Sequence, residues 1–126
     1  MNMDEIDKLS NKVIGLAIEV HRNLGPGLLE SVYQQCLAYE LSKNNIEFVS
    51  EHNIPVKYKE VNIDCGFRAD IIVAGNIILE IKEVNKILPI HEAQLMTYLK
   101  ITGIKLGLII NFNVTLLKQG IKRIIL

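Results

Sequence analysis

The fold is decided by two apolar runs separated by a short turn, which read Cys65-Gly66-Phe67-Arg68-Ala69-Asp70-Ile71-Ile72-Val73, Ala74-Gly75-Asn76 and Ile77-Ile78-Leu79-Glu80-Ile81-Lys82. Both runs are rich in β-branched residues, which favour strands. The three residues between them tolerate a positive φ, as tight turns require. The stretch therefore predicts an antiparallel hairpin formed by residues 65–73 and 77–82.

The length of the turn determines which side chains share a face of this hairpin. Side chains alternate along a strand, so Glu80 and Lys82 point to the same side. A three-residue turn brings Asp70 opposite Glu80 on that side. A two-residue turn would instead put Asp70 opposite Ile81 and direct its carboxylate away.

Two carboxylates in such a pair would have Cβ atoms about 5 Å apart, which is unfavourable without a counter-charge. A divalent cation would supply that charge, and carboxylate oxygens suit Mg²⁺ or Mn²⁺. Lys82 could then orient an attacking water or stabilise charge on a phosphate. In the alternative, Glu80 pairs with Lys82 and Asp70 with Arg68 at a solvated sheet edge. Spacing alone favours these ion pairs.

Two helices are predicted ahead of the hairpin. Apolar residues three or four positions apart form a helical stripe over residues 4–23, which Gly25-Pro26 ends. A second stripe runs from Leu29 to Leu41 and ends at the turn Asn44-Asn45. The elbow between the two stripes is short, so the helices should pack as neighbours.

The remaining elements continue the mixture of helices and strands. Periodicity predicts a strand with alternating apolar residues around 54–58, a helix at 90–102, a strand at 105–111, and a basic tail from Thr115 that fits an edge strand or a helix. Asn111-Phe112-Asn113 at the end of the apolar strand fits the sheet rim near the site and a turn equally well, and no role is assigned to it. We therefore expect a single α/β or α+β domain over residues 1–126.

Composition fits an ordinary folded domain, because the 126 residues are 49% hydrophobic and 22% charged. The formal net charge is zero, so the total indicates neither a nucleic-acid nor an anionic-membrane partner. The charge is nevertheless segregated, because no acidic residue follows Glu92. The basic residues after it are Lys100, Lys105, Lys118, Lys122 and Arg123.

No targeting signal is expected from the sequence. The chain has no basic leader and no apolar run long enough for a signal peptide or a membrane span. Cys36 and Cys65 lack the spacing of a redox or zinc motif and are expected to be reduced packing residues. These features predict a cytoplasmic protein without a membrane partner.

Two motifs resemble a known nuclease family. The stretch Gly27-Leu28-Leu29-Glu30-Ser31-Val32-Tyr33 fits the motif of the GxxExxY proteins, a branch of the PD-(D/E)XK nuclease superfamily. Asp70 followed by Glu80-Ile81-Lys82 is similar to the signature of that superfamily. Leu24-Gly25-Pro26 and His91-Glu92-Ala93-Gln94-Leu95 also look like the GxxExxY branch. Ala69 stands where the superfamily name has proline, and that proline is not a ligand.

The resemblance implies a restriction-endonuclease-like core, a mixed central β-sheet flanked by α-helices. It also implies that Asp70, Glu80 and the backbone carbonyl of Ile81 bind the metal ion. Lys82 would be the catalytic lysine. Glu30 matches an acidic residue that the first core helix of such proteins often places near the metal.

Residues that would contact the substrate come from three regions. Tyr33 lies on the same helical face as Glu30. Gln94 and Tyr98 resemble the Gln-x-x-x-Tyr pair of RecB-like nucleases, which contacts DNA, although an amide and an ordinary buried tyrosine explain them equally well. The best candidates for a phosphate-facing surface in the basic tail are Lys118, Lys122 and Arg123.

The favoured function is therefore a Mg²⁺- or Mn²⁺-dependent nuclease that acts on nucleic acid, with DNA preferred over RNA. The alternative is a catalytically silent module of the same fold that binds nucleic acid or another protein. An oligomer of this chain or a complex with a partner protein fits either function.

Overall fold

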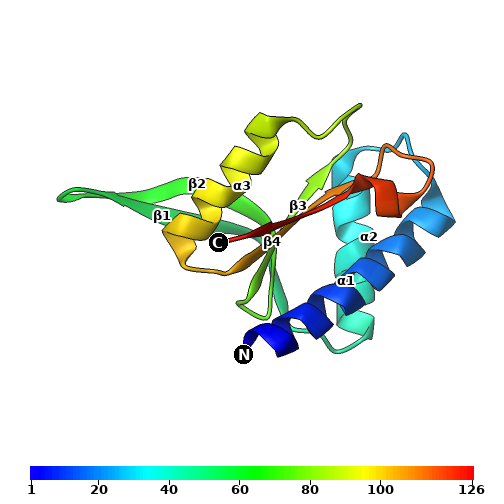
Figure 1. Ribbon diagram of the computed structural model, residues 1–126, viewed down its shortest axis with the longest axis horizontal. Helices are drawn as coiled ribbons and strands as arrows, with labels where there is room; N and C mark the ends of the chain where they lie inside the picture. The colour runs from blue at the N-terminus through cyan, green and yellow to red at the C-terminus, as the bar shows by residue number, and fades with distance from the viewer.

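The computed structural model describes residues 1–126 and contains a five-stranded sheet between two layers of helices (Figure 1). The elements in chain order are α1 (Met3–Leu24), α2 (Glu30–Lys43), β1 (Phe48–Tyr58), β2 (Val61–Val73), β3 (Ile77–Lys82), α3 (Pro89–Thr102), β4 (Leu106–Asn111), the 3₁₀-helix η1 (Leu117–Gly120) and β5 (Ile121–Ile125).

The sheet is mixed and its strands follow the order β1-β2-β3-β4-β5. β1 with β2, β2 with β3, and β4 with β5 are antiparallel. β3 and β4 are parallel, which requires a crossover connection, and α3 provides it. The predicted α/β class, with a mixed sheet flanked by helices, is therefore confirmed.

Each face of the sheet has its own apolar core. On one face α1 and α2 bury a cluster of 17 residues that includes Val13, Leu37 and Leu79. On the other face α3 buries a cluster of eight residues that includes Ile78 and Leu95. β3 is covered on both faces, which explains why it reads as a nearly continuous apolar run.

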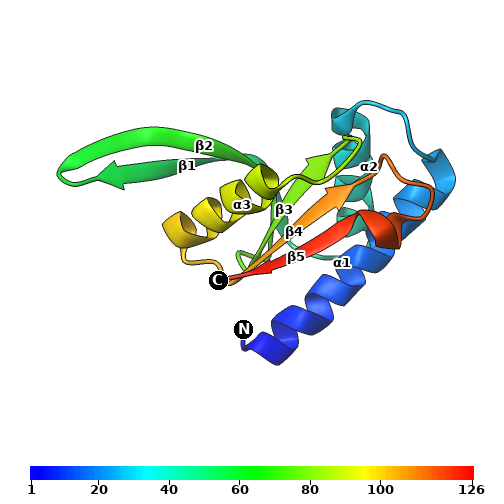
Figure 2. The same ribbon diagram turned by 45° about the horizontal axis from the view of Figure 1, so that its top comes forward.

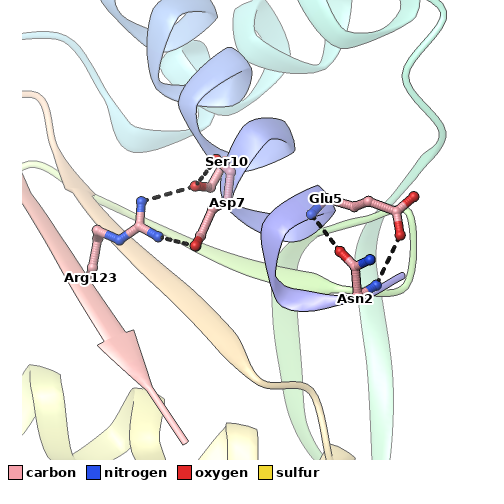
Figure 3. Close-up of polar contacts among 5 residues, drawn as sticks. All are labelled: Asn2, Glu5, Asp7, Ser10 and Arg123. Atoms are coloured by element: carbon pink, nitrogen blue, oxygen red, sulfur yellow. Dashed lines mark hydrogen bonds and ion pairs between the residues drawn. The ribbon is translucent and has the colours of Figure 1, made fainter.

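Side-chain bonds fix the start of α1 and attach its first turns to the last strand (Figure 3). Asn2 caps the helix, since its Oδ1 accepts from the Glu5 N–H at 2.9 Å and its own N–H donates to Glu5 Oε1 at 3.1 Å. Arg123 on β5 donates to Asp7 Oδ1 at 2.7 Å and to Ser10 Oγ at 2.9 Å. These two bonds hold β5 against α1.

The expected elements are present, but the first two strands are longer than predicted. β1 and β2 extend beyond the rest of the molecule as a two-stranded ribbon (Figure 2). Residues 48–53 and 61–64 gave no clear strand signal because most of them have no buried face that would impose alternation. The tail forms η1 followed by an edge strand, so both interpretations of it are partly right.

Both cysteines are free, as expected. Cys36 is partly buried, whereas Cys65 is exposed on the ribbon, so the packing role predicted for Cys65 is wrong. None of the helices is both long and apolar enough to span a membrane.

Close packing of α3 on β4 requires a glycine at position 107. A Cβ there would lie 2.8 Å from three side-chain atoms of Leu95. We expect Gly107→Ala to lower the free energy of unfolding by about 1–3 kcal/mol through overpacking. Urea denaturation measures this change.

Gly15→Ala is the matched control, because Gly15 is exposed on α1 and no neighbouring atom lies within 4 Å of the position that a Cβ would take. This change should stabilise the helix by up to about 1 kcal/mol. Leu95→Val shortens the neighbouring side chain and should lower the free energy of unfolding by less in the Gly107→Ala background than in the wild type. Equal losses in the two backgrounds would show that residues 95 and 107 are not in steric conflict.

Candidate active site

The turn between β2 and β3 has the length that brings the two acidic residues together. Val73 pairs with Ile77, and Ile71 pairs with Leu79, so residues 74–76 form a three-residue turn. Ala74 and Gly75 both have positive φ, at 50° and 66°. This register continues toward Asp70 opposite Glu80, so the two-residue alternative is excluded.

Asp70 accepts a hydrogen bond at the point where the regular pairing of β2 with β3 ends. Its Oδ2 lies 2.8 Å from the backbone N of Ile81, which donates to it. Its own carbonyl accepts from Nε2 of Gln34 on α2 at 3.2 Å. Burial raises the pKa of Asp70, and the hydrogen bond from Ile81 and the charge of Lys82 oppose this rise.

The pKa of Glu80 is shifted more than the pKa of Asp70. Its Oε1 is buried and has no hydrogen-bond partner. Burial, followed by repulsion from Asp70, raises the pKa of Glu80 from 4.5 to about 8, although Lys82 acts in the opposite direction. Glu80 therefore holds a proton at neutral pH unless a cation replaces it.

The ion pairs that spacing favoured are not formed. None of the three ion pairs in the structure includes Asp70, Glu80 or Lys82. Arg68 donates instead to Oδ1 of Asn53 on the neighbouring strand at 3.1 Å. The two carboxylates consequently face each other without a directly bonded basic side chain.

Glu30 joins this pair from the N-terminus of α2. Its charge contributes to raising the pKa values of Asp70 and Glu80. Its Oε2 accepts from the backbone N–H of Glu83 at 3.1 Å. Glu30, the acidic residue that the resemblance places near the metal, therefore lies beside the end of β3.

Tyr33 has a structural place instead of the substrate contact predicted for it. The residue is fully buried, and its ring stacks on Phe112 with centroids 4.3 Å apart. Its hydroxyl donates to the Gly25 carbonyl at 2.7 Å and accepts from the Leu28 N–H at 3.0 Å. Tyr33 thus fixes the elbow and has no free face for a ligand.

Tyr98 approaches the carboxylates from α3, on the opposite side of the sheet from α1 and α2. Burial raises the pKa of Tyr98, and the charges of Glu80 and Asp70 add to the rise. The ring stacks on Phe67 with centroids 3.8 Å apart and planes 5° apart. Gln94 lies one turn earlier on α3 and is exposed.

The three basic residues of the tail that were predicted to face phosphate differ in their contacts. Arg123 is held by Asp7 and Ser10 beside α1, so its guanidinium is engaged and the phosphate contact predicted for it is not supported. Lys118 is exposed on η1. Lys122 pairs with Ile109, which pairs with Glu80, so Lys122 is in register with Glu80 two strands away. Its Nζ lies 3.7 Å from a Glu92 carboxylate oxygen.

Asn111 lies in the site, although no role is assigned to it from the sequence. Its side chain accepts from the Val84 N–H at 3.1 Å and donates to the Val84 carbonyl at 2.8 Å. The residue is 2% exposed and pairs with Lys82 across the parallel strands. Asn111 therefore anchors the chain immediately after Lys82. The only sequence signal for it is a polar residue at the end of an otherwise apolar strand.

A family model described as PD-(D/E)XK nuclease superfamily matches residues 7–124. The chain belongs to this superfamily. Its five-stranded mixed sheet flanked by three helices agrees with a restriction-endonuclease-like fold. No significant match was found among curated proteins or among solved structures.

PD-(D/E)XK nucleases usually use divalent metal ions, and the residues present are compatible with one. No group of three or more His, Cys, Asp or Glu side chains forms a metal cage. Mg²⁺ does not require one, because it keeps several waters and binds through one or two carboxylates. The unpartnered Glu80 oxygen beside Asp70 offers such a pair.

The raised pKa of Glu80 predicts how stability varies with pH in EDTA. The folded protein keeps the Glu80 proton up to about pH 8, whereas the unfolded chain loses it near 4.5. The free energy of unfolding should therefore fall as pH rises through this window, by an amount on the order of a few kcal/mol. Asp70 contributes in the same direction.

Urea denaturation at several pH values measures this slope. Glu80→Gln removes the titrating group and should flatten the profile, whereas Glu60→Gln, at the exposed tip of the ribbon, should retain it. A slope of wild-type size in Glu80→Gln would contradict the assignment.

Asn111→Ala should destabilise the protein by about 3 kcal/mol, because it leaves the Val84 N–H and C=O without their partners. Chemical denaturation measures the loss. Asn62→Ala, an exposed position on β2, is the control and should change stability by less than about 0.5 kcal/mol. Similar losses in the two variants would rule out an anchoring role.

Proposed function

We propose that the protein is a Mg²⁺- or Mn²⁺-dependent nuclease that hydrolyses phosphodiester bonds, with DNA preferred over RNA as substrate. The observation that carries the proposal is the buried, unpartnered Oε1 of Glu80 beside Asp70. A buried carboxylate oxygen without a partner is costly, and a bound cation removes that cost.

Asp70, Glu80 and the Ile81 carbonyl would hold the ion, and Glu30 would complete the acidic surroundings. A bound divalent ion supplies positive charge for the phosphate and lowers the pKa of a water molecule that it binds. Hydrolysis joins the water oxygen to phosphorus and breaks the bond from phosphorus to the leaving sugar oxygen, which takes up a proton.

Lys82 has a separate task in this proposal. It leaves the strand on the same side as Glu80, and its charge acts on both carboxylates. Because no carboxylate in the structure pairs with it, its ammonium is free to orient the attacking water or to stabilise charge on the phosphate.

The substrate would lie over the α3 side of the sheet. Tyr98 and Gln94 would contact it from α3, and Lys122 and Lys118 from the tail. A cleft of about 350 Å³ near the tail is lined by Lys86 and Lys122 together with the acidic Glu92, three apolar residues and polar residues that include Asn111. Its two lysines could contact a phosphodiester backbone.

The proposal also includes the branch of the superfamily and the cellular location. The bonds of Gly27, Glu30 and Tyr33 give each named residue of the motif a role in the elbow, which supports membership of the GxxExxY branch. The two free cysteines are compatible with a cytoplasmic location.

Purified protein should cleave labelled single- or double-stranded DNA in Mg²⁺ or Mn²⁺ and lose this activity in EDTA. Asp70→Asn, Glu80→Gln and Lys82→Ala should each reduce the cleavage rate at least about 100-fold. Lys59→Ala, on the exposed ribbon tip, is the matched lysine control and should retain the rate. Parallel assays with RNA test the preference.

Cleavage by the wild type that does not exceed cleavage by these variants would overturn the nuclease proposal. Salt-dependent DNA binding in that case would identify the silent nucleic-acid-binding module.

A further inference from the structure

Glu83 directly follows Glu80-Ile81-Lys82. It makes two hydrogen bonds to the elbow between α1 and α2. Its Oε1 accepts from the backbone N–H of Gly27 at 3.1 Å. Its own backbone N–H donates to Oε2 of Glu30 at 3.1 Å. One residue thus contacts two positions of the elbow that lie more than fifty residues earlier in the chain.

The elbow is shaped to make this contact. Gly27 has a φ of 101°, a conformation that favours glycine, while no neighbour crowds the position of a Cβ. The requirement for glycine is therefore conformational, and the resulting backbone directs the Gly27 N–H toward Glu83. Tyr33 holds the residues on either side of Gly27 through its hydroxyl.

Glu30 depends on this contact for its position. It is an exposed residue at the first position of α2, where a free glutamate side chain would sample several rotamers. The backbone N–H of Glu83 bonds to the Glu30 carboxylate, and the Glu83 side chain keeps the two groups within reach by holding Gly27, three residues before Glu30. The charge of Glu30 acts on Asp70 and Glu80.

One buried oxygen of Glu83 is a second, independent observation. Its Oε2 is buried and has no partner, so the side chain carries a desolvation cost while its other oxygen serves the elbow. A solvated rotamer would avoid this cost but would release Gly27.

We propose that Glu83 is a positioning residue, which clamps the elbow to the end of β3 and thereby holds Glu30 beside Asp70 and Glu80. This inference rests on the proposed function for its role toward the metal ion. The clamp itself is independent of any activity.

Mn²⁺ binding, measured by electron paramagnetic resonance, tests the role toward the metal. Glu83→Ala and Glu30→Ala should each weaken binding about tenfold, and the double variant should bind no more weakly than Glu30→Ala. Additive losses would overturn action through Glu30. Glu60→Ala is the control for removal of an acidic residue and should bind like the wild type.

Glu83→Gln separates position from charge. Its amide oxygen can still accept from Gly27, so Mn²⁺ binding should stay within about threefold of the wild type. Binding as weak as in Glu83→Ala would show that charge, and not positioning, is what Glu83 supplies. The conservative change also guards against a folding defect in Glu83→Ala.

Hydrogen exchange of the Gly27 amide tests the clamp without any metal. Protection of this amide should fall at least about tenfold in Glu83→Ala and persist in Glu83→Gln. Unchanged protection in Glu83→Ala would overturn the inference. A wild type that binds no Mn²⁺ and cleaves nothing would overturn the proposed function and the role toward the metal, while the exchange result still decides whether Glu83 holds the elbow.

Discussion

The hydrogen bond from the Ile81 amide to the Asp70 carboxylate is the interaction on which the candidate site depends. It forms where the regular pairing of β2 with β3 stops, so the acidic side chain takes the place of a backbone acceptor. The bond holds Asp70 beside Glu80 although both carboxylates are partly desolvated. The apolar residues below the pair enforce this arrangement, because β3 is buried on both faces and cannot slip by one residue without exposing its core.

The site is assembled from elements that reach one end of β3 by different routes. The elbow before α2 delivers Glu30, α3 delivers Tyr98, and β4 delivers Asn111, which secures the chain after Lys82. The polar groups therefore surround a rigid strand end instead of lying on a long loop. Such support favours a fixed geometry for these polar groups.

Most of the framework was accessible from the sequence because it follows from periodicity. The strand Ile77–Lys82 was predicted with the bounds that it has, whereas the sequence left two registers open and the three-residue turn decides between them. The resemblance supplied Glu30, which no spacing rule could have connected to β3. Long-range polar bonds were not accessible: nothing in the sequence indicated that the Tyr33 hydroxyl would bond to Gly25, that Arg123 would bond to Asp7, or that Asn111 would bond to Val84. Each of these depends on packing between residues far apart in the chain.

The bond between Arg123 and Asp7 has a consequence for synthesis of the protein. It joins residues 116 positions apart, so the first helix gains this partner only after β5 has been made. Until β5 is made, β4 also presents an unpaired edge of strongly apolar residues, which is the kind of surface that recruits other chains. On the ribosome the nascent chain therefore exposes this apolar edge until β5 emerges and pairs with it.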